Sequence, residues 1–157
     1  MENTEVKNEL EEKLKKFNVT KINTLEELKK VIDFSEKKEP IVVADGYSML
    51  IMDNVDYNET YLIDVFNNFY EKHKEKLEEI GMKFFYVDSL ELKSYVMRMG
   101  EIVPIQDPEY LEKNVLVPSI FVTDKDKNDV GVLRESKISV LDESDFEDSL
   151  RYLTKKQ

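Results

Sequence analysis

Apolar residues recur at every third or fourth position in five stretches of the chain, a spacing that places them on one face of a helix. The longest stretch begins at Tyr57, and the helix that it predicts should end just before Gly81, because glycine favours the position that follows a helix. Another begins with Thr24 and Glu27, which have the spacing of a capping box. Helices are therefore predicted at residues 2–17, 24–38, 57–80, 89–100 and 142–153.

Short, continuous apolar runs lie between these helices and predict β-strands. The run Ile41–Ala44 has the composition of a central strand that is covered on both faces. After it we expect a loop at Asp45–Ser48 and then a surface turn whose apolar side chains continue to Met52. The other predicted strands are 18–22, 83–87, 120–123 and 130–134, and the last two form a hairpin around a polar turn.

This order of elements predicts an α/β fold with a mixed sheet and helices on both faces. The chain also resembles the thioredoxin-like superfamily. The resemblance rests on the stretches PIVVADGYS (central strand and active-site turn), KFFYVD (next parallel strand), VPSIFVTDKDKNDVGVL (proline loop and hairpin) and the C-terminal helix. It covers roughly residues 23–155, so we expect a helical extension at 1–22, a domain at 23–157 and an elaboration at 89–116.

The resemblance implies a cis peptide bond before Pro118 and a groove between two loops that binds extended peptide. The Cys-X-X-Cys motif of the family is missing, and residues near Ser48–Ile51 stand in its place. The chain has no cysteine at all, which excludes thiol–disulfide exchange, because that reaction needs a thiolate. The single histidine, His73, excludes multi-histidine metal sites within one chain. We therefore expect no metal and no cofactor.

The charge of the chain argues against some partners. It carries 34 acidic and 23 basic residues, for a formal net charge of −11, whereas binding to nucleic acid depends on clustered Lys and Arg. No apolar run is long enough to span a membrane, and the charged N-terminus lacks a secretory signal. The expectation is a cytoplasmic protein that binds neither nucleic acid nor membranes.

The resulting hypothesis is a redox-inactive thioredoxin-like module that binds a protein or peptide, with the 47–52 turn and the Pro118 loop as its groove. An exposed apolar patch of this kind is a candidate interaction surface. The other possibility is that residues 89–116 fold over the patch and bury it. The candidate binding residues are Tyr47, Ser48, Met49, Leu50, Met52, Val117, Pro118 and Ser119.

Two further functions stay open. An acidic inhibitor or nucleic-acid mimic would act through the negative surface of the chain. A non-thiol enzyme would use Asp45 and Ser48, although a serine nucleophile needs a base beside it. A calcium loop at 124–135 is disfavoured, because Asp129 stands where that loop needs glycine. The partner and the oligomeric state do not follow from the sequence.

Overall fold

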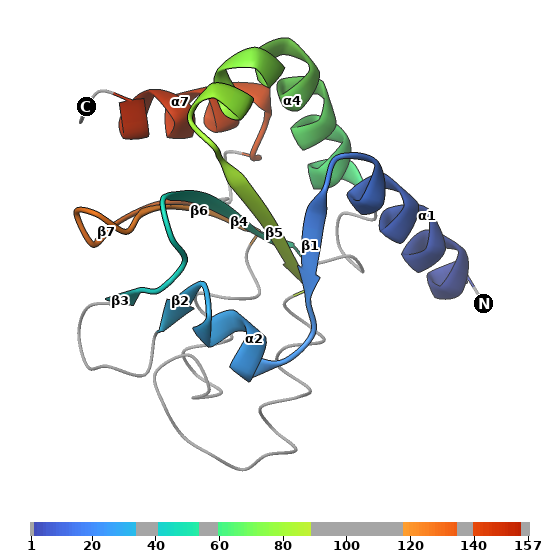
Figure 1. The fold of residues 1–157 in the computed structure, drawn as a ribbon. Coiled ribbons are helices and arrows are strands. Elements are labelled where there is room, and N and C mark those ends of the chain that lie inside the picture. Colours follow the sequence, from blue (N-terminus) through green and yellow to red (C-terminus); the bar gives the residue numbers. More distant parts are fainter. Residues whose placement is uncertain (1, 34–40, 54–59, 89–117, 135–139, 155–157) are drawn as a thin grey trace.

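The computed structural model describes residues 2–33, 41–53, 60–88, 118–134 and 140–154 (Figure 1). A five-stranded mixed sheet has the order β1-β5-β4-β6-β7. Strands β1, β5 and β4 run parallel to one another, β6 runs antiparallel to β4, and β7 runs antiparallel to β6. The predicted α/β fold with a mixed sheet flanked by helices is confirmed. The elements are α1 (Glu2–Lys16), β1 (Val19–Ile22), α2 (Leu25–Lys29), β2 (Ile32–Asp33), β3 (Ile41–Val42), β4 (Tyr47–Asp53), α4 (Tyr61–Glu79), β5 (Lys83–Asp88), β6 (Ser119–Asp124), β7 (Asp129–Arg134) and α7 (Glu143–Thr154).

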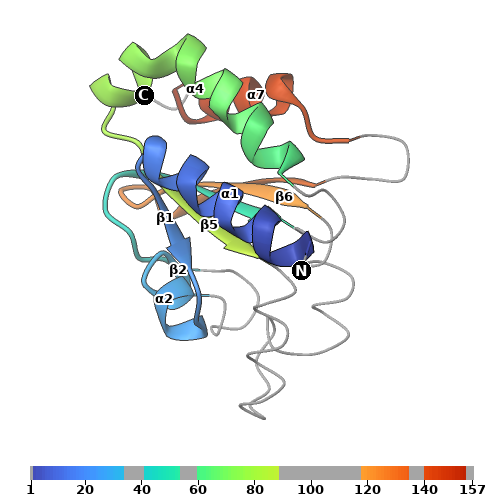
Figure 2. The same cartoon turned by 90° about the vertical axis from the view of Figure 1, so that its right-hand side faces the viewer.

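The described elements lie in layers around this sheet. Helices α1, α4 and α7 cover one face, here called the helical face, while α2 and the small β2–β3 sheet lie below the opposite face (Figures 1 and 2). The core of the helical face is rich in aromatic rings, such as Phe66 against Phe84 at 5.1 Å and Phe69 stacked on Phe146 at 5.5 Å. A second, smaller apolar cluster contains Leu50, Met52, Val87 and Phe121 on the opposite face.

The central strand is not the one that the sequence indicates. Ile41–Val42 pairs only with β2 among the described residues, and Ile41 is 42% exposed. The central position belongs to β4, which pairs with β5 on one side and with β6 on the other. The predicted loop and surface turn at 45–52 are therefore wrong beyond Gly46, whose φ of +69° supplies the actual turn before the strand.

The N-terminal residues belong to the same sheet and core. The helix predicted at 2–17 is confirmed as α1, and its residues Leu10 and Leu14 are buried in the helical-face core. Strand β1 pairs in parallel with β5. The described sheet therefore includes Val19–Ile22, which precede the expected domain boundary between residues 22 and 23.

The remaining predictions have mixed outcomes. The strands at 83–87 and in the hairpin are confirmed, as is the helix end before Gly81, whose φ is +68°. The helix predicted at 24–38 is shorter, because α2 ends at Lys29 and β2 follows. The helix predicted at 89–100, the elaboration at 89–116 and the peptide bond before Pro118 lie outside the described residues. No helix in the described part of the chain is both long and apolar enough to cross a membrane.

Candidate functional site

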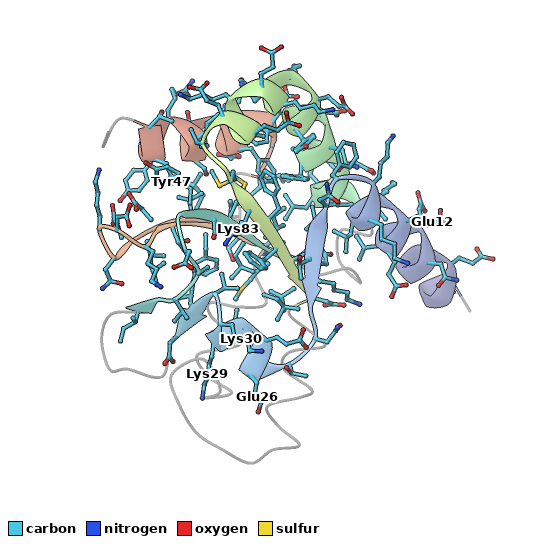
Figure 3. All side chains as sticks on the ribbon, viewed as in Figure 1. Glu12, Glu26, Lys29, Lys30, Tyr47 and Lys83 are labelled. Atoms are coloured by element: carbon cyan, nitrogen blue, oxygen red, sulfur yellow. The ribbon has the colours of Figure 1, made fainter. Side chains whose placement is uncertain are left out.

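Most residues of the predicted groove that the structure describes are buried. Ser48, Met49, Leu50 and Met52 are all 0% exposed, because β4 has a strand on each side and side chains packed on both faces. A residue without exposed surface cannot contact a partner. Tyr47 alone keeps some exposed surface, at the start of β4 on the side that α7 covers (Figure 3).

The two segments of the predicted groove are nevertheless neighbours. Met52 is the register partner of Ser119, so the end of β4 lies beside the start of β6. Pro118 and Ser119 are both buried, and Val117 lies outside the described residues. The structure thus brings the two segments together as paired strands rather than as two facing loops.

Asp45 and Ser48 do not form a catalytic pair. The Asp45 carboxylate accepts a hydrogen bond from Lys125 Nζ at 2.8 Å, and this contact holds the pKa of Asp45 below its usual value. The Ser48 hydroxyl is buried and has no hydrogen-bond partner among the residues that the structure describes. A serine without an adjacent base is a poor nucleophile, so the geometry gives no support to hydroxyl chemistry here.

A buried acidic pair lies at the other end of β4, where sequence reasoning placed nothing. Asp53 and Asp88 are register partners at the carboxyl ends of two parallel strands, and they are 0% and 5% exposed. The Tyr86 hydroxyl donates to Asp53 Oδ2 at 2.8 Å. The signal was present in the sequence, since both YSMLIMD and KFFYVD are apolar runs that end in aspartate. In the described residues no group of three or more potential metal ligands is present.

A cleft on the helical face lies between α7 and the end of the sheet. It has a volume of ≈ 300 Å³. Its floor comes from strands β6 and β7, and its wall comes from α7, which runs above both strands (Figure 1). The lining residues are Val122, Gly131, Leu133, Asp148, Ser149 and Tyr152.

Gly131 and Tyr152 shape one end of this cleft. A Cβ atom at Gly131 would lie 2.9 Å from Tyr152 Cε1, so only glycine lets the ring lie this close to the strand. The Tyr152 hydroxyl donates to the Asp129 carboxylate, at 2.9 Å to Oδ2. The ring therefore closes the cleft at the hairpin end, and no sequence motif marked these residues beforehand.

Strand β7 is the last strand of the described sheet, and its residues Gly131 and Leu133 line the cleft. The Lys125 N–H donates to Gly46 O at 3.2 Å, beside the register pair Tyr47–Asp124. The backbone of Lys125 therefore bonds toward β4. Since backbone groups alternate in direction along a strand, the preceding residue, Asp124, and every second residue before it bond toward β7. Their register partners are Asp129, Gly131 and Leu133. The outward N–H and C=O groups of β7 consequently belong to Val130, Val132 and Arg134.

The wall of the cleft is acidic. Helix α7 carries Glu143, Asp145, Glu147 and Asp148 against the single basic residue Arg151. Two of the acids bind α4, because Lys72 Nζ lies 2.6 Å from Glu143 and His73 Nε2 lies 2.9 Å from Glu147. Asp148 is paired with Arg151 one turn along the same helix, and it is the one acid that lines the cleft.

A second cleft, of ≈ 410 Å³, lies on the opposite face between β5, β1 and the α2 region. Lys30, directly after α2, and Lys83, at the start of β5, line it (Figure 3). Glu27 and Asp45 line it too, and Asp45 is paired with Lys125. Its charges are therefore mixed, and they favour no single class of ligand.

Comparison of this chain with protein-family models, with curated proteins and with solved structures finds no match.

Proposed function

We propose that this chain is a protein-binding module without thiol chemistry, which binds an extended segment of its partner along β7. The observation that carries the proposal is an edge strand that borders a cleft: β7 ends the described sheet, and the cleft opens between it and α7. Extended segments bind such edges by strand addition, in which main-chain hydrogen bonds supply affinity and pockets for alternate side chains supply specificity.

A thioredoxin-like architecture is part of the proposal. It is supported by a central strand, β4, with a parallel neighbour reached through a helix and an antiparallel hairpin that begins after Pro118. The absence of cysteine leaves such a fold with no thiol to react. The proposed surface differs from the one expected from the resemblance, because residues 48–52 are buried in the interior.

The polar groups around the cleft favour binding over catalysis. Ser149 Oγ donates to the Asp145 carbonyl at 2.9 Å, so its hydroxyl is engaged within α7. The Tyr152 hydroxyl donates a hydrogen bond to Asp129, and Asp148 forms an ion pair with Arg151. None of these contacts places a base beside a nucleophile, whereas an apolar floor and outward backbone groups are what an extended segment needs.

The outward N–H of Val132 gives the test. Peptides would first be selected on the whole chain from a phage library of random linear nonapeptides and then titrated by calorimetry. Val132→Pro removes one outward donor without touching the ladder to β6, and Val132→Ala is the matched control that keeps the donor. We expect Val132→Pro to lose about twofold to tenfold in affinity relative to Val132→Ala, because one backbone hydrogen bond is worth about 0.5–1.5 kcal/mol.

Thermal unfolding of both variants checks that the sheet is intact. Equal affinities in two folded variants would exclude strand addition at β7. A library that yields no peptide, on protein with a cooperative melting curve, would contradict the binding function itself.

A further inference from the structure

The charges around the cleft define the chemistry of the segment that binds there. We infer that it is a basic extended segment, in which an apolar side chain enters the cleft and a Lys or Arg two residues away lies against Asp148. This inference rests on the proposed function. It adds two properties of the bound segment to strand addition: the spacing between its apolar anchor and its charged residue, and the sign of that charge. Both properties can be measured.

The apolar anchor follows from the walls of the cleft. Val122, Gly131 and Leu133 form its floor, and the Tyr152 ring closes one end. Its volume of ≈ 300 Å³ is at the lower end of the about 300–1,000 Å³ that ligand pockets span, so it takes a side chain rather than a large ligand. A floor of aliphatic groups favours an aliphatic or aromatic side chain.

The basic residue follows from Asp148, the only acid among the described residues that line the cleft. Asp148 is 53% exposed at its side chain, and its partner Arg151 is 62% exposed, so the carboxylate is open to a second cation. Successive side chains of a strand alternate between faces, and residues i and i+2 share one face. An anchor in the cleft therefore puts the residues two positions away, and not its immediate neighbours, on the side of α7.

The same charges disfavour a second copy of this chain as the occupant. Pairing of two β7 edges would bring two acidic α7 helices toward each other, and the chain as a whole carries a charge of −11. Like charges at an interface oppose association, whereas a basic segment is attracted to this surface.

Two synthetic peptides of identical composition test the spacing. Both derive from a peptide selected on the whole chain, and the only Lys stands two residues from the apolar anchor in one and directly beside it in the other. Overall attraction to the acidic protein is the same for both. We expect the first to bind about 1.5-fold to fivefold more tightly, the range of an exposed ion pair, and the difference to shrink in 0.5 M salt.

A charge swap tests the residue. The double variant Asp148→Arg with Arg151→Asp keeps an ion pair on α7 but moves the acid away from the cleft. On this variant we expect the preference to invert, so that a peptide with Glu two residues from the anchor binds better than its Lys counterpart. An unchanged preference for Lys would overturn the role of Asp148.

The outcomes separate the two proposals. If both peptides bind equally and both lose affinity on Val132→Pro, strand addition stands and the basic spacing is wrong. If neither binding depends on Val132, the function proposed above fails as well. Sedimentation that shows a dimer of the wild type, lost in Val132→Pro, would assign the edge to a second copy and overturn the inference.

Discussion

Asp142 shows how single side chains fix an element that carries the candidate site. Its carboxylate accepts hydrogen bonds from the Ser144 N–H at 2.9 Å and the Ser144 hydroxyl at 2.6 Å, while its own N–H donates to Asp145 at 2.8 Å. This reciprocal cap satisfies backbone donors at the start of α7. We expect Asp142→Ala to lower the melting temperature by about 3 °C, and Asp142→Asn by less, because Asn also caps well.

The cap also has a predictable pH dependence. The hydrogen bond from the Ser144 hydroxyl is the main cause that lowers the pKa of Asp142 below its ordinary value of 3.8. A carboxyl whose pKa is lower in the folded state stabilises the fold above its unfolded pKa and loses that contribution as the pH falls. The difference in melting temperature between wild type and Asp142→Asn should therefore shrink below about pH 4. A difference that grows toward acid pH would contradict this cap.

At the scale of elements, the sequence indicated every strand of the large sheet except the central one. Met and Leu in the stretch Ser48–Met52 favour helices by intrinsic propensity, and the β-branched run Ile41–Val43 is the better strand former. Pairing with neighbours on both sides decides the matter instead, and those neighbours, β5 and β6, come later in the chain. The candidate cleft shares this limit, because Gly131 and Tyr152 meet only through the packing of α7 on the hairpin.

A pair of equal substitutions separates the two assignments of this region. Met49→Asp would place a charge at a position with 0% exposure, and Val43→Asp would place it at one that is 38% exposed. We expect Met49→Asp to cost more than about 4 kcal/mol and to abolish cooperative unfolding, whereas Val43→Asp should change stability by about 0.5 kcal/mol or less. Urea unfolding followed by circular dichroism measures both. A folded Met49→Asp protein would restore the surface turn that the sequence indicated.

At the scale of the whole molecule, α1 decides whether the chain has a dispensable N-terminal segment. The span of the resemblance indicated a helical extension at 1–22, but Leu10, Leu14 and Phe17 all join the core of the helical face. Phe17 packs edge-on against Tyr70 of α4 at 5.1 Å between ring centroids. Lys13 bridges to Asp64, also on α4, at 2.5 Å. Sequence periodicity cannot show these contacts, because it reveals one face of a helix and not what covers it.

Removal of α1 should therefore lower the free energy of unfolding of the whole chain. Leu14→Ala deletes a side chain that is 2% exposed, and we expect a loss of about 2–5 kcal/mol in the free energy of unfolding. Lys15→Ala, one residue along on the exposed side of the same helix, is the control and should change stability by about 0.5 kcal/mol or less.

A chain without residues 2–17 should expose the rings of α4 and lose its cooperative transition in urea. If the shortened chain unfolded at the same urea concentration as the full chain, α1 would be an appendage and the domain would begin after it. Equal effects of Leu14→Ala and Lys15→Ala would lead to the same conclusion, since only burial distinguishes the two positions.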